Sequence, residues 1–430
     1  MKRRLLPILM TLVLVCALPI WAAFVTSGDV TNPLVCTAGA TSSEESAVDK
    51  LKLAISRGVD AQLTEDIEIT QTLYVERSMT IDLNGHVLKM TGDGSVLRVS
   101  DRATLTITDS RPQNPHTEPY AGLPAGGVIT GGKGTDAGGS IHFVGGAVFL
   151  ENGTTLKLEG GTLTGNSGSS IYIGGATLVM SGGTITGETV GVHNNVGIFT
   201  MTGGRITGCS YRGVYVYNGN MTMSGTAYIG GNPNARKEDI YVYESDHKHT
   251  DLSVTGGTIA GKVRIVFLES LGPTQEELKA AANSVVKEQG VFDGHIKVEK
   301  GTSGTCVDYN SVNFIDEVAK TRTLKLVLQP NAVEEPETPA TVNGREFMYW
   351  TKEGASEAWD FNTVIEVPLT LYAVRTPASS SGGYYYHPTT DTKADDAKGS
   401  PKTADPGVAL YAALSLLSLT GLTCTGRKKF

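Results

Sequence analysis

A six-residue pattern recurs along the middle of the chain and limits the fold more than any other feature. It reads Gly-Gly-Thr-Ile-Thr-Gly with small variations, and its copies begin at Gly126, Gly160, Gly182, Gly203, Ser224 and Gly256. The three most regular copies, at Gly160, Gly182 and Gly203, are 22 and 21 residues apart. Short alternating strands between glycine turns at this period are typical of the coils of a parallel β-helix.

Apolar residues occupy matching positions in successive periods and are predicted to stack into four inward-facing rows. The first two rows are Leu156, Leu178, Phe199, Met221 and Leu252, and Leu158, Met180, Met201, Met223 and Val254. The other two are Leu163, Ile185, Ile206 and Ile259, and Val148, Ile171, Val192, Val214 and Ile240. One coil cannot bury its own apolar face, but stacked coils share a continuous core. The chain is therefore predicted to be all-β, with a right-handed parallel β-helix over residues 46–270.

Two helices are predicted to close the ends of this β-helix. The first, Ala47–Arg57, has apolar residues at helical spacing and lies between Ser46 as N-cap and Gly58. We expect it to cover the first coil, because an open end exposes unpaired strands and core. The second helix, Gln275–Gln289, falls in the segment 271–321, which is predicted to connect the β-helix to the next module.

The N-terminus has the composition of a secretory signal. Basic residues precede the apolar stretch Leu5–Trp21, and small residues follow it. We expect a signal peptide over residues 1–27, with cleavage after Ala22 or Ser27. The body of the protein is therefore predicted to be secreted.

The C-terminus is predicted to hold the protein at the cell surface. Val408–Cys424 carries no charge and is followed by basic residues, which predicts a hydrophobic anchor and basic tail over 406–430. A flexible linker is expected over 378–405. It ends in the motif Ser400, Pro401, Lys402, Thr403 and Ala404.

The order of motif, apolar run and basic tail resembles the sortase sorting signal of Gram-positive surface proteins. The resemblance implies that a sortase cuts after Thr403 and joins the protein to the cell wall. A plain membrane anchor is the alternative. In either case the body is expected to face outward from the cell.

The β-helix segments resemble the pectin-lyase-like superfamily, especially the non-catalytic surface proteins of Gram-positive gut bacteria. The resemblance is carried by the turn Asp82-Leu83-Asn84-Gly85-His86 and by the glycine-rich copies, and it extends over about Val48 to Phe267. It implies the β-helix fold and leaves the function open, because this fold hosts both enzymes and binding proteins.

A second resemblance concerns the segment 322–377. Gly344–Thr351, Trp359–Thr363 and Leu369–Ala373 resemble a Listeria–Bacteroides repeat. That family implies a small β-grasp-like module, used as a spacer or interaction domain in surface proteins. Its Trp and Phe residues are the expected core of so small a domain.

An aromatic stripe is predicted on the outside of the β-helix. The outward neighbours of the fourth row, together with two rings further along the same strands, are Phe149, Tyr172, His193, Tyr215, Tyr217, Tyr241 and Tyr243. Because side chains alternate between the faces of a strand, these rings should line up on one surface. An exposed row of rings can stack on sugars or pack against a protein. An ordinary ladder that stabilises the sheet is the other interpretation.

No catalytic residue is predicted. Enzymes on this fold need convergent carboxylates, whereas Glu151, Glu159 and Glu188 are expected to be scattered, solvated turn charges. Arg205 and Arg212 are likewise expected to be isolated outward residues. The acids and bases of the coils therefore predict no active site.

No metal site, cofactor or nucleic-acid partner is predicted either. Asp246–Asp251 is interpreted as a polar loop, although it contains two histidines. Cys36, Cys209 and Cys306 are too widely spaced for a disulfide framework and are expected to be free thiols. A net charge of −8 provides no basic surface for nucleic acid.

Together these features predict a non-enzymatic adhesin or glycan-binding protein on a Gram-positive envelope. Its expected partners are a glycan or host matrix protein at the stripe, and sortase with peptidoglycan, or the membrane, at the C-terminus. A polysaccharide lyase or glycoside hydrolase is one alternative. A passive spacer is another, favoured if the insertion Gly231–Asp239 covers the stripe.

Overall fold

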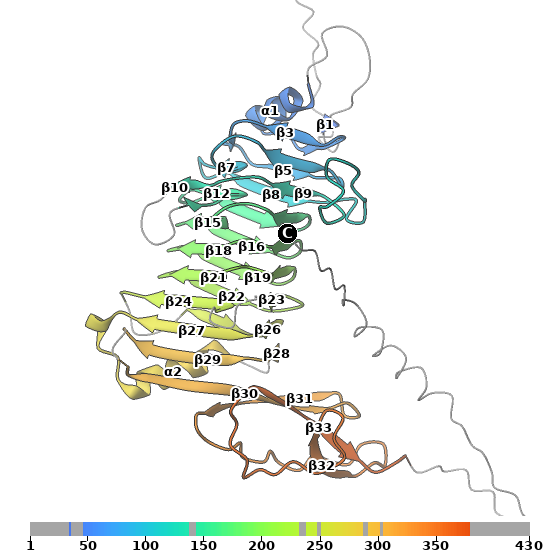
Figure 1. Cartoon of the computed structure of the whole chain (residues 1–430), viewed down its shortest axis with the longest axis vertical. Helices are drawn as coiled ribbons and strands as arrows, with labels where there is room; N and C mark the ends of the chain where they lie inside the picture. Colours follow the sequence, from blue (N-terminus) through green and yellow to red (C-terminus); the bar gives the residue numbers. More distant parts are fainter. Residues whose placement is uncertain are drawn as a thin grey trace, which may run out of the picture. The chain divides into compact units, whose positions relative to one another are not determined.

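The computed structural model contains a parallel β-helix, as the repeat predicts (Figure 1). It describes residues 34–35, 46–136, 143–231, 238–246, 251–286, 291–301 and 304–378. Three sheets, here called A, B and C, run along the β-helix, and each coil contributes one short strand to each sheet. Neighbouring coils pair in parallel throughout the repeat.

The strands of the three sheets are short and follow one another in chain order. Sheet A contains β1 (Leu34–Val35), β2 (Ala61–Gln62), β5 (Met79–Asp82), β8 (Thr104–Thr108), β13 (Thr155–Leu158), β16 (Thr177–Met180), β19 (Ile198–Met201), β22 (Asn220–Met223) and β25 (Leu252–Val254). Sheet B contains β3 (Ile67–Ile69), β6 (Val87–Met90), β9 (Val128–Thr130), β14 (Thr162–Thr164), β17 (Thr184–Thr186), β20 (Arg205–Thr207), β23 (Tyr228–Gly230), β26 (Thr258–Ala260) and β28 (Val291–Phe292).

Sheet C is the longest because it runs on into the C-terminal module. Its strands in the β-helix are β4 (Leu73–Val75), β7 (Leu97–Val99), β12 (Val148–Leu150), β15 (Ser169–Gly174), β18 (Val190–Asn195), β21 (Arg212–Tyr217), β24 (Ile240–Glu244), β27 (Lys262–Phe267) and β29 (His295–Lys300). Beyond β29 it continues with β30 (Cys306–Asp316), β31 (Thr321–Leu328), β33 (Leu369–Arg375) and β32 (Phe347–Lys352). A separate hairpin joins β10 (Thr135–Asp136) to β11 (Phe143–Val144).

The four predicted inward rows are confirmed in register. Leu156 pairs with Leu178, which pairs with Phe199, and Met221 follows in the next coil. All of these side chains are fully buried. The row through Ile206 also contains Ile229, which was not predicted and lies between Ile206 and Ile259.

The turn that starts at Asp82 is held together by carboxylates that bridge coils. One oxygen of Asp82 accepts hydrogen bonds from the backbone N–H groups of Asn84 and Ser110, both at 2.9 Å. Asp109 in the next coil accepts in turn from the backbone N–H of Gly85 at 2.8 Å. Asn84 and Gly85 both have positive φ, at 48° and 75°, which these residue types adopt at low cost. The turn residues therefore have a structural role between coils.

Both predicted helices are present at the ends of the coil stack (Figure 1), but the second ends at Val285 and not at Gln289, since Val286 forms a β-bridge with Val254. Helix α1 (Ala47–Arg57) begins at Ser46, whose hydroxyl accepts from the Asp49 N–H, and it packs on the first coil. Helix α2 (Gln275–Val285) follows the short 3₁₀ turn η1 (Glu269–Leu271) and packs on β25, β29 and β30. Apolar side chains of both helices join the main core, so each helix covers residues that have no further coil to pack against.

The C-terminal module starts earlier in the chain than residue 322. Strand β30 pairs with β31 and β33, and β33 pairs with β32, so the module shares β30 with the end of the β-helix. A separate small core lies between these strands and includes Phe314, Trp350 and Leu371. Arg375 binds the carboxylate of Asp316 in a buried ion pair, with Nε to Oδ2 at 2.9 Å.

The predicted signal peptide, wall linker, sorting motif and anchor lie outside the described residues. In the part of the chain that the structure describes, no helix has the length and apolar character needed to cross a membrane. Cys209 is buried and Cys306 is exposed, no disulfide joins them within the described residues, and Cys36 lies outside those residues.

Candidate binding face

The residues of the aromatic stripe lie together in two columns on the outer face of sheet C. The first column pairs Phe149, Tyr172, His193, Tyr215 and Tyr241 from strands β12 to β24. The second pairs Tyr217 with Tyr243, two residues further along β21 and β24. Figure 1 shows these strands one above another along the β-helix. The predicted alignment of the rings is therefore present, whatever its function.

The rings pack on one another along the coil axis. Ring centroids are 4.8 Å apart for Phe149 and Tyr172, 4.7 Å for His193 and Tyr215, and 5.6 Å for Tyr217 and Tyr243. The last pair is nearly parallel, at 7°. All seven side chains are half-buried, which differs from the exposed row expected from alternation. Alternation ignores the rings of neighbouring coils, which cover much of each ring and leave edges outward.

Cations extend the first column at both ends. Arg98 precedes Phe149 in register and lies over its ring, 4.6 Å from the centroid. Arg264 follows Tyr241 in register, and Lys297 follows Arg264. The column therefore changes from rings to cations as sheet C approaches the C-terminal module.

Arg212 lies within the stripe and is not the isolated outward residue that we expected. Its guanidinium carbon is 3.6 Å from the Tyr241 centroid and 4.9 Å from the Tyr215 centroid. Its Nε is 3.6 Å from a carboxylate oxygen of Glu238. Arg205 is exposed, as expected, but it is not isolated either, because its guanidinium carbon lies 4.0 Å from the centroid of Tyr228 on sheet B. Residues far apart in sequence meet here through coil stacking, which a count along one strand does not reveal.

A charge network joins the cationic end of the face. Glu238 binds Arg264 at 3.3 Å, and Glu299 binds both Arg264 Nε at 2.6 Å and Lys297 Nζ at 2.8 Å. The two cations Arg264 and Lys297 are each 38% exposed, whereas the side chains of Glu238 and Glu299 are 11% and 9% exposed. Positive groups thus face solvent above buried acids, so this end of the face favours negatively charged partners.

Three rings of the stripe, His193, Tyr215 and Tyr241, have shifted pKa values. Burial, together with the nearby Arg212, lowers the pKa of His193 to about 4, so the imidazole is neutral at neutral pH. Burial raises the pKa of Tyr215 to about 12, against the opposing effect of Arg212. Burial also raises the pKa of Tyr241, so these three rings are uncharged across the physiological range.

Glu188 is not the solvated turn charge that we expected. Its side chain is fully buried, and burial raises the pKa of the carboxyl to about 8 despite hydrogen bonds from Asn166. The backbone N–H of Asn166 donates to it at 3.1 Å, and so does Asn166 Nδ2 at 3.1 Å. The turn after β17 stacks on the turns of neighbouring coils and encloses the carboxyl. Hydrophobic alternation carries no signal for this burial, because the residue lies outside the strands.

Several functional candidates were missed by the sequence reasoning. Arg264, Lys297, Glu238 and Glu299 were not singled out, although Arg264 and Lys297 continue the register of Tyr241. The glycine pattern ends before the strands that carry Arg264 and Lys297, so the repeat gave no sign of these two cations. Most of the insertion within Gly231–Asp239 and the two histidines of the polar loop lie outside the described residues. Among the described residues no cluster of metal-ligating side chains is present.

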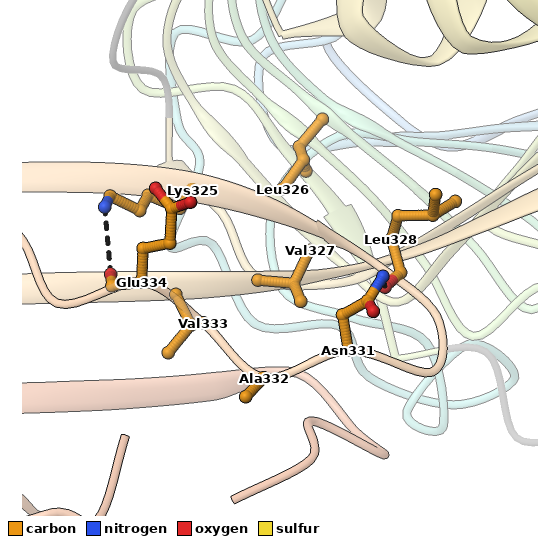
Figure 2. A pocket seen from close by; sticks show the side chains of 8 residues that line it. All are labelled: Lys325, Leu326, Val327, Leu328, Asn331, Ala332, Val333 and Glu334. Atoms are coloured by element: carbon orange, nitrogen blue, oxygen red, sulfur yellow. Dashed lines mark hydrogen bonds between the residues drawn. The ribbon is translucent and has the colours of Figure 1, made fainter. Parts of the chain in front are cut away.

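A cavity of about 500 Å³ lies away from the stripe, in the C-terminal module (Figure 2). It is bounded by Lys325–Leu328 of β31 and by the returning segment Asn331–Glu334. Lys325 Nζ donates to the backbone carbonyl of Glu334 at 2.9 Å and ties the two sides together. None of the residues predicted to bind a ligand lines this cavity.

The aromatic and cationic face of this β-helix specifies a kind of site, a binding surface, and not a particular protein. Comparison of the sequence with models of protein families, with curated proteins and with solved structures finds no significant match.

Proposed function

We propose that this chain is a non-enzymatic binding protein displayed on the outside of a Gram-positive cell, with the aromatic stripe of sheet C as its ligand face. The proposal rests on one observation above the others. Seven ring residues from five coils occupy two register columns, and exposed cations continue the longer column. The expected ligand is a glycan or a host matrix protein.

The mode of binding follows from the packing of the rings. The rings of the column are half-buried and pack at centroid distances of 4.7 to 5.5 Å, so a ligand meets ring edges, hydroxyl groups and the cations at the end. The two tyrosine pairs Tyr215–Tyr241 and Tyr217–Tyr243 bring four hydroxyls to one area. Tyrosine supplies rigid contact area and a hydrogen-bonding tip at low entropic cost. Display at the surface rests on the signal peptide, sorting motif and anchor expected from the sequence.

The test removes the hydroxyls and keeps the rings. The full-length chain, displayed on a Gram-positive host, is applied to an array of glycans and purified matrix proteins. The variant Tyr215→Phe/Tyr217→Phe/Tyr241→Phe/Tyr243→Phe should bind at least about ten-fold more weakly, at an unchanged unfolding temperature. The control is Tyr228→Phe, whose ring lies on sheet B beneath Arg205. Equal binding by the quadruple variant and the control would remove the stripe as the ligand face.

A passive spacer is the second candidate, and ring stacking favours it. Half-buried rings that pack on one another stabilise the outside of a β-helix without any ligand. In that case all variants and the parent bind nothing on the array. Removal of a ring from the stripe then affects only stability: Tyr215→Ala alone should lower the unfolding temperature, because its ring contacts both His193 and Tyr241.

A further inference from the structure

One turn beside the stripe departs from the equivalent turns of its neighbouring coils. Val196 follows β18 and has a φ of +59°, in the left-handed region. By strand register its counterparts are Gly175 in the coil before, with φ +65°, and Asn218 in the coil after, with φ +46°. Glycine and asparagine enter this region at low cost, whereas a β-branched residue is strained there.

The same turn exposes two aliphatic side chains. Val196 is 60% exposed and Ile198 is 49% exposed. The positions paired with Ile198 are Thr177 and Asn220, which are both polar. A single coil thus carries large apolar groups at two outward positions where its neighbours carry glycine, asparagine or threonine. Neither conformational preference nor core packing accounts for them, and strain retained at an exposed residue indicates a functional contact.

This apolar pair adjoins the stripe. Asn195, the residue before Val196, is in register with Tyr217 and through it with Tyr243. The Val196 N–H also donates to the Tyr217 carbonyl at 2.9 Å. The Val196–Ile198 turn therefore continues the second ring column around the edge of sheet C. Arg264 lies three strands further along the sheet, a separation of about 14 Å in the direction of coil stacking at the usual strand spacing.

We infer that the ligand of this face is a protein, which buries apolar side chains on Val196 and Ile198 and places acidic groups opposite Arg264 and Lys297. This inference rests on the proposed function and selects between its two ligand classes. A sugar needs an open ring face, and no ring of this column stands in the open, because all five are half-buried and neighbouring ring centroids lie 4.7 to 5.5 Å apart. Two exposed aliphatic side chains favour an apolar protein partner, and exposed cations above buried acids favour an acidic one.

The partner also has to make its contacts through side chains. Each strand of sheet C between β12 and β27 is already paired on both sides, so no free edge is available there for strand addition. The apolar turn and the cationic end are fixed on one rigid stack of coils. We therefore expect specificity to come from the spacing of apolar and acidic groups on the partner.

The test substitutes the residues that the neighbouring coils already carry. In Val196→Asn/Ile198→Thr the new residues match Asn218 and Thr177, so the coil should fold at least as well as in the parent. The matched control is Val367→Thr, an exposed aliphatic residue, 66% exposed, in the C-terminal module. Full-length chain is tested against immobilised fibronectin, fibrinogen, laminin and collagen, against their deglycosylated forms, and against the glycans released from them.

Binding to at least one matrix protein should survive deglycosylation and fall about ten-fold or more in the double variant, with the control unchanged. Binding should also weaken with added salt and in Lys297→Ala, because the cationic end contributes. If the chain binds the released glycans and no longer binds the deglycosylated proteins, the inference of a protein ligand is overturned and the proposed function still stands. Binding to a matrix protein that the double variant retains in full overturns the inference as well. If the parent binds no probe, both the inference and the proposed function fail.

Discussion

The coils of the β-helix and the C-terminal module reach their cores in opposite ways. In the coils, a buried residue such as Phe199 meets residues at the equivalent position of the coil before and the coil after, Leu178 and Met221. In the module, Phe314 and Trp350 come from strands with no repeat relation, and their ring centroids lie 5.1 Å apart. The stability of the coils is therefore approximately a sum of interactions between adjacent coils. The stability of the C-terminal module depends instead on a few long-range contacts.

The largest expected effect tests the nearest-neighbour character of the coils. Phe199→Ala should lower the free energy of unfolding by about 3–5 kcal/mol, because it leaves a cavity in a fully buried row. Hydrogen exchange should accelerate in β16, β19 and β22 and stay unchanged in β32 and β33. Thr200→Ala, on the outer face of the same strand, is the control and should change little. Faster exchange in the module as well would show that the two regions unfold together.

The next effect tests the module, which depends on a buried ion pair. Asp316→Ala leaves the Arg375 guanidinium buried without its carboxylate, and both side chains are only 1% exposed in the parent. We expect a loss of about 3 kcal/mol, confined to the module, measured by urea unfolding with tryptophan fluorescence. Lys133→Ala breaks the exposed pair of Lys133 and Asp93 on the coils and should leave unfolding unchanged. Equal effects of the two substitutions would contradict the contrast between the regions.

The coils were more predictable from the sequence than the module, and the reason is physical. A fixed period places one apolar residue above the next, so the positions of the glycine pairs were enough to predict the register of Leu178, Phe199 and Met221. The missing member, Ile229, belongs to a degenerate copy, in which Thr226 and Ala227 take the register positions of Gly203 and Gly204. Strand β30 was not predicted, because no repeat marks it and its pairing partners are distant.

The candidate site was predictable only in part, for the same reason. Register predicted the alignment of the rings, but it did not predict how far neighbouring rings cover one another. The burial of Glu188 depends on the stacking of turns, where no alternating pattern exists. The strain at Val196 is a property of backbone conformation, which becomes visible only when its counterparts Gly175 and Asn218 are known.

A smaller expected effect concerns Glu188, the carboxyl enclosed by the coils, and the pH dependence of the free energy of unfolding. The pKa of Glu188 is raised from 4.5 to about 8, so the folded chain holds a proton that the unfolded chain has lost between these pH values. Stability from this group is therefore present below about pH 4.5 and is lost as pH rises towards 8.

Glu188→Gln should remove this dependence and raise the free energy of unfolding at pH 8 by about 1–2 kcal/mol, because the neutral amide needs no proton. Urea unfolding of parent and variant across pH 5 to about 8 measures the difference. Glu159→Gln, at a turn position that is exposed, provides the control and should follow the parent. A parallel pH dependence of parent and Glu188→Gln would show that the carboxyl is ionised in the folded chain.

The smallest expected effect is a gain in stability at Val196. It tests whether this residue is present for the stability of the coil or for a contact with a ligand. Val196→Gly should raise the free energy of unfolding by about 1 kcal/mol, because it relieves a left-handed conformation that a β-branched residue resists. The gain is reduced by the extra entropy of glycine in the unfolded chain. The reciprocal change, Gly175→Val, should be destabilising, since its new Cβ lies 2.8 Å from Asn152 Oδ1 as well as at positive φ.

Thermal unfolding of Val196→Gly, Gly175→Val and the parent measures whether a valine at this turn position destabilises the coil. If the glycine variant is less stable than the parent, then Val196 stabilises the coil and its retention needs no partner. A more stable variant means that the parent carries a residue which its own fold disfavours. Core rows such as that of Phe199 show no such conflict, because there packing and conformation favour the same residue. The conflict is confined to an exposed turn beside the rings, where a contact with another molecule is the remaining source of stabilisation.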